Sequence, residues 1–453
     1  MDVLAELVEA LPEGAVLTDP DIIEGYRFDW SRDPNAGTPI AVVRADDAGQ
    51  VQATVRWAAK HDVPIVPRGA GSGLSGGSSA VDGGIVLSME RMRNVEIDPI
   101  CQVAVVEPGA FNKDVKVAAA EHGLWYPPDP SSFDICSIGG NVATNAGGLC
   151  CVKYGVTTDY VLGLDVVLAD GTLVSLGGKR IKDVAGLSLL KLFVGSEGTL
   201  GIVTRAILRL VPAQAPRSTM VAVFPDVDSA ARAVVSVRQE LRPSMLELMD
   251  HASINAVEDH RSMGLDRSAG ALLLAQSDAP SPARGQEVAV MQKACEDSGA
   301  VDVFVTDDPD EGEMFVEARR QAFPAIGARG TLMLEDVGVP IPQLPELLAA
   351  IATIAADYET EIPVVAHAGD GNTHPLIVFD EKDDDAARRA GEAFDAIMHA
   401  AIELGGTITG EHGVGRTKKR ALPDQLGPDV MALTRRVKDA LDPQGILNPG
   451  AIL

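Results

Sequence analysis

The chain has little cysteine, and no two cysteines stand in a C-x-x-C arrangement. Its 453 residues include five cysteines, at positions 101, 136, 150, 151 and 295. This spacing excludes a zinc knuckle and the common iron–sulfur motifs. An odd and scattered set also indicates a reducing compartment.

Positive charge is scarce as well. Lysine and arginine number 38 against 65 acidic residues, which gives a net charge of −27. This balance argues against binding nucleic acid or an anionic membrane through a general positive field. The first residues, Met1–Glu6, are acidic where a signal peptide needs bases, and no apolar run reaches membrane-spanning length. We therefore expect a protein of the cytoplasm, or one peripheral to the inner face of the membrane, with no transmembrane segment.

The glycine-rich segment Pro67–Gly77 lacks the helix that a Rossmann fold requires after it. Three of its glycines match the G-x-G-x-x-G spacing, but a turn and the apolar run Ile85–Leu87 follow. Glycines let successive backbone N–H groups approach an anion, and Arg68 adds a cation. The segment therefore predicts a phosphate-holding loop between two strands, with a surface turn rich in Gly and Ser as the alternative.

Apolar residues are plentiful enough for two or three domains, at 46% of the chain. Helices are predicted at Val3–Leu11, after Asp46 or Asp47, and from Asn112, whereas Asp19–Gly37 reads as irregular. Predicted strands are residues 40–43, 85–88, 102–106, 164–168, 172–176 and 202–210, with Asp170-Gly171 as a hairpin turn. A domain boundary is expected before Ser218. The pattern indicates an α+β fold.

Residues Trp125–Gly155 show little periodicity. Their core, Ser137–Gly148, contains paired glycines with Asn and Thr between apolar residues. Long segments without regular structure are often functional, and this one suits the wrapping of an extended polar ligand. A disordered loop is the alternative, and the interleaved apolar residues weigh against it.

Histidines occur in two motifs that indicate a metal site. In the first, His367 and His374 flank Asp370-Gly371, and a two-residue turn there would place the two histidines directly opposite each other. Imidazoles on such a cross-strand pair reach a single metal ion. In the second motif, Gly410–Gly415, Glu411 offers a third ligand and His412 a free base. The alternative is a set of structural histidines in tight turns.

A metal beside phosphate-holding loops suggests a specific chemistry. A cation with open positions chelates a carboxylate and a neighbouring hydroxyl, lowers the hydroxyl pKa and so prepares hydride loss from the same carbon. The acceptor must be a redox cofactor. The failed Rossmann signature and the two glycine-rich segments point to a flavin held in another way.

These motifs, together with Gly195–Val203, resemble flavoproteins of the vanillyl-alcohol oxidase / p-cresol methylhydroxylase (PCMH) superfamily. Within it, the histidine motifs resemble the branch of D-lactate dehydrogenase, the glycolate oxidase FAD subunit and D-2-hydroxyglutarate dehydrogenase. The resemblance implies a PCMH-type FAD-binding domain at 1–212, a cap or substrate domain with an antiparallel sheet and flanking helices at 213–420, and a C-terminal segment, 421–453, that returns to the FAD domain.

The resemblance also implies the site residues. FAD would be non-covalent, because Ser72 stands where some relatives attach flavin through a histidine. The residues expected to hold it are Pro67, Arg68, Gly69, Ala70, Gly71, Ser72, Gly77, Ser137, Ile138, Gly140, Asn141, Ala143, Thr144, Gly148, Gly198, Ile202, Val203 and Asn448.

For the substrate side, the resemblance implies that His367, His374 and Glu411 bind zinc or manganese and that His412 is the base. Arg319 would clamp the substrate carboxylate, since a guanidinium suits that contact, with Arg320 as the alternative. Asn372 is expected to bind substrate as well.

Together these features predict an FAD-dependent, metal-assisted dehydrogenase that oxidises a small D-2-hydroxy acid, such as lactate or glycolate. Relatives that act on 2-hydroxyglutarate carry a lysine where this chain has Leu334, so the dicarboxylate is the alternative substrate. Two other functions stay open at this point: a metal-dependent hydrolase of a phosphorylated substrate, and an electron-transfer subunit with no substrate of its own. The expected electron acceptor is a quinone, a cytochrome, an electron-transferring flavoprotein or a partner subunit, and a homodimer is also compatible.

Overall fold

The computed structural model describes residues 3–453, which form two compact units. The first contains residues 3–147, 156–213 and 411–453, and the second contains residues 148–155 and 214–410. Within residues 3–453, no helix has both the length and the apolar character needed to cross a membrane.

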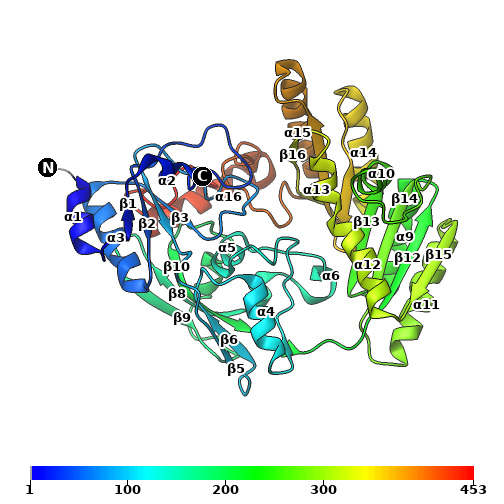
Figure 1. Ribbon diagram of the computed structural model, residues 1–453, viewed down its shortest axis with the longest axis horizontal. Coiled ribbons are helices and arrows are strands. Elements are labelled where there is room, and N and C mark those ends of the chain that lie inside the picture. Colours follow the sequence, from blue (N-terminus) through cyan, green and yellow to red (C-terminus); the bar gives the residue numbers. More distant parts are fainter. Residues whose placement is uncertain (1–2) are drawn as a thin grey trace. The chain divides into compact units, whose positions relative to one another are not determined.

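The first unit holds a four-stranded and a five-stranded sheet (Figure 1). In the smaller sheet, β2 (Ala41–Arg44) and β3 (Ile65–Arg68) both run parallel to the central β4 (Ile85–Ser88), and β1 (Val16–Leu17) pairs antiparallel with β2. The larger sheet is antiparallel, in the order β5 (Val95–Asp98), β6 (Val103–Val106), β10 (Ile202–Arg209), β8 (Val161–Val167) and β9 (Leu173–Gly177). β7 (Leu124–Trp125) and β11 (Val211–Pro212) form a separate short pair.

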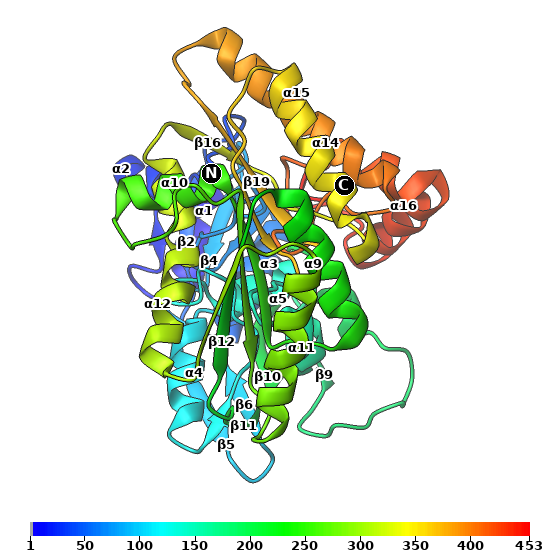
Figure 2. The same ribbon diagram turned by 90° about the vertical axis from the view of Figure 1, so that its right-hand side faces the viewer.

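The start of α3 (Ala48–His61) follows the expected cap, because Asp47 accepts a hydrogen bond from the Gln50 N–H. The other helices of the first unit are α1 (Val3–Ala10), α2 (Pro20–Glu24), α4 (Asn112–Ala120), α5 (Ile138–Thr144), α7 (Thr157–Tyr160), α8 (Leu190–Phe193) and α16 (Leu422–Leu441). Between β9 and α8 the chain forms a long loop without regular structure (Figure 2).

Two of the irregular segments expected from the sequence contain helices. Within 19–37, Asp19 caps α2, whose first residue is Pro20, a favoured residue at that position. Within 125–155, the segment expected to wrap a ligand as an extended loop instead forms α5, capped by Ser137 and ended by Asn145 in the left-handed conformation, and α6 (Cys151–Tyr154). Glycines at 139 and 140 lower helix propensity, but the caps and the buried Ile138 and Val142 outweigh it.

The C-terminal segment completes the core of the first unit. Ile446 and Leu447 are buried in the cluster that contains Ile65 and Leu87, and the Ile65 N–H donates to the Ile446 carbonyl. The segment that packs with this unit begins at residue 411, ten residues before the expected 421, because the N–H groups of Arg416 and Thr417 donate to the carbonyl of Ser75.

The second unit is built on an eight-stranded antiparallel sheet. Its main path is β15 (Asp302–Thr306), β12 (Ser218–Phe224), β14 (Ala271–Ser277), β13 (Met245–Asp250), β18 (Val364–His367), β19 (Asn372–Phe379) and β16 (Thr331–Leu334), with β17 (Val337–Gly338) also paired to β19.

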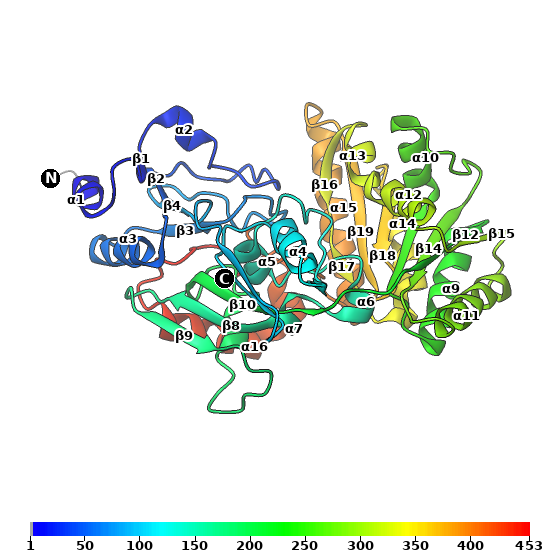
Figure 3. The ribbon, with the colours of Figure 1, turned by 60° about the horizontal axis from the view of Figure 1, so that its bottom comes forward.

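Helices flank the sheet of the second unit (Figure 3). α9 (Val227–Glu240) and α11 (Ala283–Asp297) pack together on strands β12 and β14, and α10 (His251–His260), α12 (Pro309–Arg320) and α13 (Ala322–Gly327) lie on the other face. α14 (Leu344–Asp357), preceded by the 3-10 turn Ile341–Gln343, packs against α15 (Asp384–Glu403). The expected α+β class, with an antiparallel sheet and flanking helices in the second part, is confirmed.

Candidate functional site

The glycine-rich loop of the first unit joins two parallel strands without a helix, as its sequence predicts. It leaves β3 at Arg68, whose buried guanidinium lies directly beneath Gly71. A Cβ on Gly71 would meet the Arg68 Nη2 atom at 2.1 Å, and Gly71 has a φ of +72°. Burial lowers the pKa of Arg68, and the nearby Asp29 carboxylate opposes that effect. The Arg68 guanidinium therefore packs against the loop at Gly71 and supports it.

The loop touches the start of α5 through Ser137. The Ser137 hydroxyl accepts hydrogen bonds from the Ala70 N–H at 3.2 Å and the Gly140 N–H at 3.3 Å. A Cβ on Gly69 would lie 2.1 Å from the same oxygen, so only glycine allows this approach. Two of the segments expected to hold FAD are thus brought together.

The third and fourth segments meet the loop from other sides. Gly198, with a φ of +71°, packs so closely on Pro67 that a Cβ would lie 2.3 Å from its Cγ atom. The buried Asn448 donates to the carbonyls of Gly77, at 2.8 Å, and Glu197, at 2.7 Å. All four segments therefore line one region of the first unit, with glycines where side chains would fill it, which fits a bound dinucleotide.

The other residues expected to bind FAD differ in their surroundings. Asn141 uses its amide inside the unit, where it accepts from Asn112 at 3.0 Å and contacts Cys136. Ile138 and Ile202 are fully or almost fully buried in the protein core. Gly148 opens the short segment that packs with the second unit. The backbone of Ala143 accepts from the Glu197 N–H, while Ser72, Thr144 and Val203 are partly exposed within the first unit.

Sequence reasoning missed Glu197. Its buried carboxylate accepts the N–H groups of Val414 and Gly415, each at 2.8 Å. Burial raises the pKa of Glu197 to about 7, against the lowering effect of these two hydrogen bonds. The Ser75 hydroxyl also donates to the His412 carbonyl at 3.0 Å. These contacts hold the backbone of the turn that carries Glu411 and His412.

In the second unit, the two histidines are neighbours, but the predicted register is wrong. His367 pairs with Asn372, and His374 pairs with Val365, because the loop between β18 and β19 has four residues rather than two. The Gly369 N–H, expected to pair with Asn372, donates instead to the Leu246 carbonyl of β13. A shift of two residues keeps both histidines on one face. Their ring centroids lie 5.0 Å apart with the rings nearly perpendicular.

Arg319, and not Arg320, is the buried arginine of α12. The Arg319 side chain is 7% exposed, whereas that of Arg320 is 29% exposed and pairs with Glu313. The Arg319 Nε atom lies 3.0 Å from Glu247 Oε2. The same carboxylate lies 2.8 and 2.9 Å from Nδ1 of His367. Glu247, which the sequence analysis did not identify, therefore links the predicted carboxylate clamp to a predicted metal ligand.

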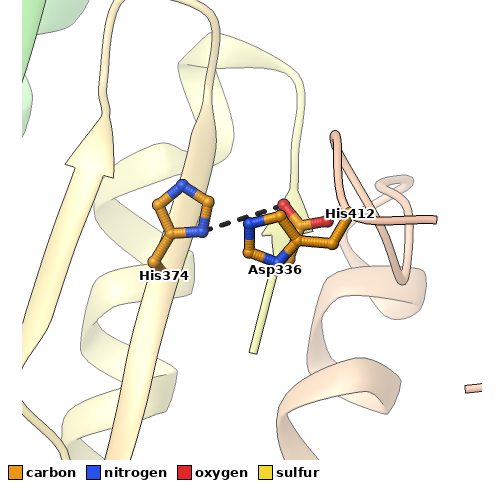
Figure 4. Close-up of side chains that lie close together, drawn as sticks. All are labelled: Asp336, His374 and His412. Carbon is orange, nitrogen blue, oxygen red and sulfur yellow. Dashed lines mark ion pairs between the residues drawn. The ribbon is translucent and has the colours of Figure 1, made fainter. Parts of the chain in front are cut away.

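Asp336 is a second residue that the sequence analysis missed. It is fully buried, and its Oδ1 atom lies 3.8 Å from His374 Nδ1, the contact marked in Figure 4. Its Oδ2 atom accepts from the Thr409 hydroxyl at 2.7 Å and the Gly410 N–H at 3.0 Å. A signal was present, since Glu335 and Asp336 interrupt the apolar run 332–339, and a carboxylate in such a run is rarely buried without a partner.

Asn372 is buried at the start of β19, and its Oδ1 atom has no hydrogen-bond partner among residues 3–453. Gly410 packs against it so tightly that a Cβ would lie 2.3 Å from this oxygen. Glu411 and His412 follow Gly410 directly, and their side chains approach each other to 3.7 Å. Within the second unit, His367, His374 and Asn372 thus share the β18–β19 region, as the motif predicts.

The donor set of the second unit fits a divalent cation. His367 and His374 are buried neighbours, and the Nδ1 atom of His367 lies 2.8 Å from a carboxylate oxygen of Glu247. Histidine ligands of metals commonly have such a carboxylate partner on the other ring nitrogen. This arrangement supports the reading of the pair as metal ligands over that of isolated structural histidines.

Comparisons with known proteins agree with these observations. Residues 39–177 match the family described as FAD binding domain, and residues 213–452 match FAD linked oxidases, C-terminal domain. The chain is 42% identical to glycolate oxidase subunit GlcD of Bacillus subtilis, covering 91% of this chain and 88% of that one. It is 33% identical to D-lactate dehydrogenase of Archaeoglobus fulgidus, covering 100% of this chain and 99% of that one.

Solved structures show the same fold at low identity. The p-cresol methylhydroxylase structure with substrate bound aligns with a TM-score of 0.84 and 19% identity, covering 99% of this chain and 95% of that one. The 4-ethylphenol oxidase from Gulosibacter chungangensis aligns with a TM-score of 0.82 at 19% identity, covering 99% and 96%. The chain therefore belongs to the FAD-linked oxidases, and it is an FAD-linked oxidoreductase of the glycolate oxidase / D-lactate dehydrogenase type.

Proposed function

We propose that this protein is an FAD-dependent, metal-assisted dehydrogenase that oxidises a small D-2-hydroxy acid, of the size of lactate or glycolate, to the 2-oxo acid. The observation that carries the proposal is the buried Arg319, held by Glu247 beside the histidine pair of the second unit. The Arg319 guanidinium and a pair of metal-binding imidazoles together suit a substrate with a carboxylate and an adjacent hydroxyl.

Arg319 binds the substrate carboxylate in this proposal. Its Nε and Nη2 atoms are buried and have no hydrogen-bond partner among residues 3–453, although Nε forms an ion pair with Glu247 at 3.0 Å. A buried donor of this kind is costly unless a ligand satisfies it, and a carboxylate matches the shape and charge of the guanidinium. Asn372, whose Oδ1 atom is also without a partner there, is the second substrate contact.

His367, His374 and Glu411 are the proposed metal ligands, for zinc or manganese, and His412 is the proposed base. When bound, the cation polarises the substrate hydroxyl and lowers its pKa. His412 then takes the hydroxyl proton. The hydrogen bonds of Ser75 and Glu197 to residues 412, 414 and 415 fix the backbone that presents Glu411 and His412.

FAD is the proposed hydride acceptor, bound without a covalent link because Ser72 offers no imidazole in the first loop. A bound flavin would supply the two-electron acceptor that oxidation at C2 of the substrate requires. The glycine-lined region of the first unit supports this role, since the close approaches at Gly69, Gly71 and Gly198 leave backbone where side chains would otherwise stand.

A monocarboxylate substrate is favoured over D-2-hydroxyglutarate. Leu334, at the end of β16 opposite Leu376, packs on the apolar core of the second unit and offers no charge for a second carboxylate. The alternative substrate, D-2-hydroxyglutarate, requires another cation. The hydrolase reading has lost its support, because the chain is an FAD-linked oxidoreductase.

The electron acceptor is proposed to be a partner subunit, a quinone, a cytochrome or an electron-transferring flavoprotein. The names of the GlcD relatives describe them as subunits, which supports a protein partner. A homodimer, and a location in the cytoplasm or at the inner face of the membrane, remain parts of the proposal.

Anaerobic mixing of the purified flavoprotein with D- and L-lactate, glycolate and D-2-hydroxyglutarate tests the substrate directly. We expect rapid bleaching of the oxidised flavin band by D-lactate or glycolate and slow or absent bleaching by L-lactate. Bleaching by D-2-hydroxyglutarate alone would replace the monocarboxylate with the dicarboxylate, and no bleaching by any of the four would favour the electron-transfer subunit.

A further inference from the structure

Glu247 lies at the centre of the sheet of the second unit, and its carboxylate contacts two groups with different proposed roles. It sits in β13, between β14 and β18, and is 1% exposed. The pairing of Leu248 with Ala366 places Glu247 opposite His367 on the same face. Both carboxylate oxygens approach His367 Nδ1, and Oε2 also approaches Arg319 Nε.

We propose that Glu247 is a positioning residue that holds the metal ligand His367 and the carboxylate-binding Arg319 together, so that metal binding and substrate binding depend on each other. The inference rests on the function proposed above. It assigns Glu247 no contact with the substrate, the cation or the flavin.

The contact with His367 sets which ring nitrogen is available. An ionised carboxylate only accepts hydrogen bonds, so the Nδ1 atom of His367 must carry the proton that it shares with Glu247. The lone pair of the neutral ring is then on Nε2, which is the nitrogen with the electronic form that a cation requires. Without the carboxylate, nothing at Nδ1 selects this tautomer.

The contact with Arg319 leaves one end of the guanidinium for a ligand. The Nε atom lies 3.0 Å from Glu247 Oε2 as an ion pair, and both Nε and Nη2 are buried without a hydrogen-bond partner among residues 3–453. The planar guanidinium is rigid, so fixing its Nε edge also fixes the direction of its Nη atoms. Glu247 therefore fixes the orientation of the Arg319 guanidinium as well as balancing its charge.

A purely structural role is the competing interpretation, because a buried arginine needs a counter-ion wherever it stands. The two interpretations predict different effects of losing Glu247 on the affinity for zinc. Charge balance alone predicts that loss of Glu247 changes stability. The positioning role predicts that it also changes the affinity for zinc and the effect of zinc on binding of the substrate carboxylate.

Glu247→Gln in the full-length, FAD-loaded protein tests the proposal, because it keeps the size of the side chain and removes its charge. The measurements are zinc affinity by competition with a chelator, and pyruvate affinity from the change in the flavin spectrum, with and without zinc. We expect zinc affinity to fall about 10- to 100-fold, the usual effect of removing a partner of a metal ligand. We also expect zinc to stop strengthening pyruvate binding.

Asp250→Asn is the matched control. Asp250 lies on the same strand, is half-buried, and accepts the N–H groups of Ser253 and Val364, so its loss affects folding but neither Arg319 nor His367. Glu247→Asp is the second variant, since it keeps the charge but retracts the carboxylate. If Glu247→Gln fails to fold, at least a tenfold loss of zinc affinity in Glu247→Asp supports the proposal, and unchanged affinity overturns it.

The outcomes separate this proposal from the one on which it rests. If wild type binds no zinc or manganese, the metal-assisted function and the role of Glu247 both fail. If wild type binds zinc and Glu247→Gln binds it equally well, with only a loss of stability like that of Asp250→Asn, the positioning role alone is overturned.

Discussion

At the scale of single residues, the buried carboxylate of Glu197 makes a prediction about pH. Its folded-state pKa, about 7, lies above the ordinary value of 4.5, so the folded protein holds an extra proton between these pH values. Stability therefore falls as the pH rises from about 4.5 to 7 and levels off above that, and the pKa difference of about 2.5 corresponds to about 3 kcal/mol.

Glu197→Gln removes this titration. We expect the variant to lose about 1 kcal/mol at pH 5, because the amide oxygen accepts only one of the two N–H groups of Val414 and Gly415. At pH 8 the free energy of unfolding of the variant, relative to that of wild type, should be higher than at pH 5 by about 3 kcal/mol. Urea unfolding of both proteins at the two pH values measures this, and a difference that does not change with pH would contradict the assignment.

His374→Ala tests the metal site at the same scale. The segments that fit FAD lie in the first unit, whereas His374 lies on β19 of the second, so the variant should stay yellow. Loss of a ligand removes the Lewis acid, and we expect kcat/KM to fall at least about 100-fold. Stopped-flow flavin reduction and metal analysis check this. Full activity in a yellow, metal-free variant would refute the metal role.

The sequence predicts contacts between neighbouring residues better than contacts between residues far apart in the chain. Histidines flanking a tight turn were placed correctly on one face, yet their register was wrong, because β13 binds the Gly369 N–H and lengthens the loop. Arg319 and Arg320 are not distinguishable from spacing alone. Glu247 could not be found, since its partners lie 72 and 120 positions further along the chain.

At the scale of elements, the meeting of the glycine-rich loop with α5 decides whether the FAD region forms. The sequence singled out both segments but predicted the second as an extended loop, because paired glycines lower the helix propensity between the caps Ser137 and Asn145. Composition therefore marked the two segments as candidates for ligand binding, while the conformation of the second depended on helix caps and on packing.

Gly69→Ala tests this meeting point. The added methyl group would lie 2.1 Å from the Ser137 hydroxyl, so the loop must move, and we expect FAD affinity to fall at least about tenfold as backbone contacts with the ligand are lost. In Gly69→Ala with Ser137→Ala, the clashing oxygen is gone and part of the affinity should return. Fluorescence titration of the apoprotein with FAD measures both. No recovery in the double variant would show that the contact with Ser137 is not the cause.

At the scale of the whole molecule, the FAD unit is assembled from distant parts of the chain. The boundary expected before Ser218 lies close to the observed change at residue 214, because composition shifts there. The return of the C-terminal segment was expected only from a resemblance. Its start at residue 411 was not predictable locally, since the bonds from Arg416 and Thr417 to Ser75 join positions more than 300 residues apart.

Leu447→Ala tests the contribution of the returning segment. Leu447 is fully buried against Ile65 and Leu87, so its truncation should cost about 2–5 kcal/mol of unfolding free energy and weaken FAD retention. Val184→Ala is the control, because Val184 is 97% exposed and should change stability by less than about 0.5 kcal/mol. Thermal melts and flavin content of the purified variants compare the two. Equal effects would mean that the segment adds little to the core.

The central claim is that one polypeptide binds a flavin and passes to it the hydride of a small D-2-hydroxy acid. Anaerobic stopped-flow spectroscopy of the purified protein, mixed with D-lactate and with glycolate, tests it most directly. The account predicts a yellow protein whose oxidised flavin absorbance disappears on mixing, with a stoichiometric yield of the 2-oxo acid. A protein that neither carries FAD nor takes it up on reconstitution, or a flavin that stays oxidised with every 2-hydroxy acid, would contradict it.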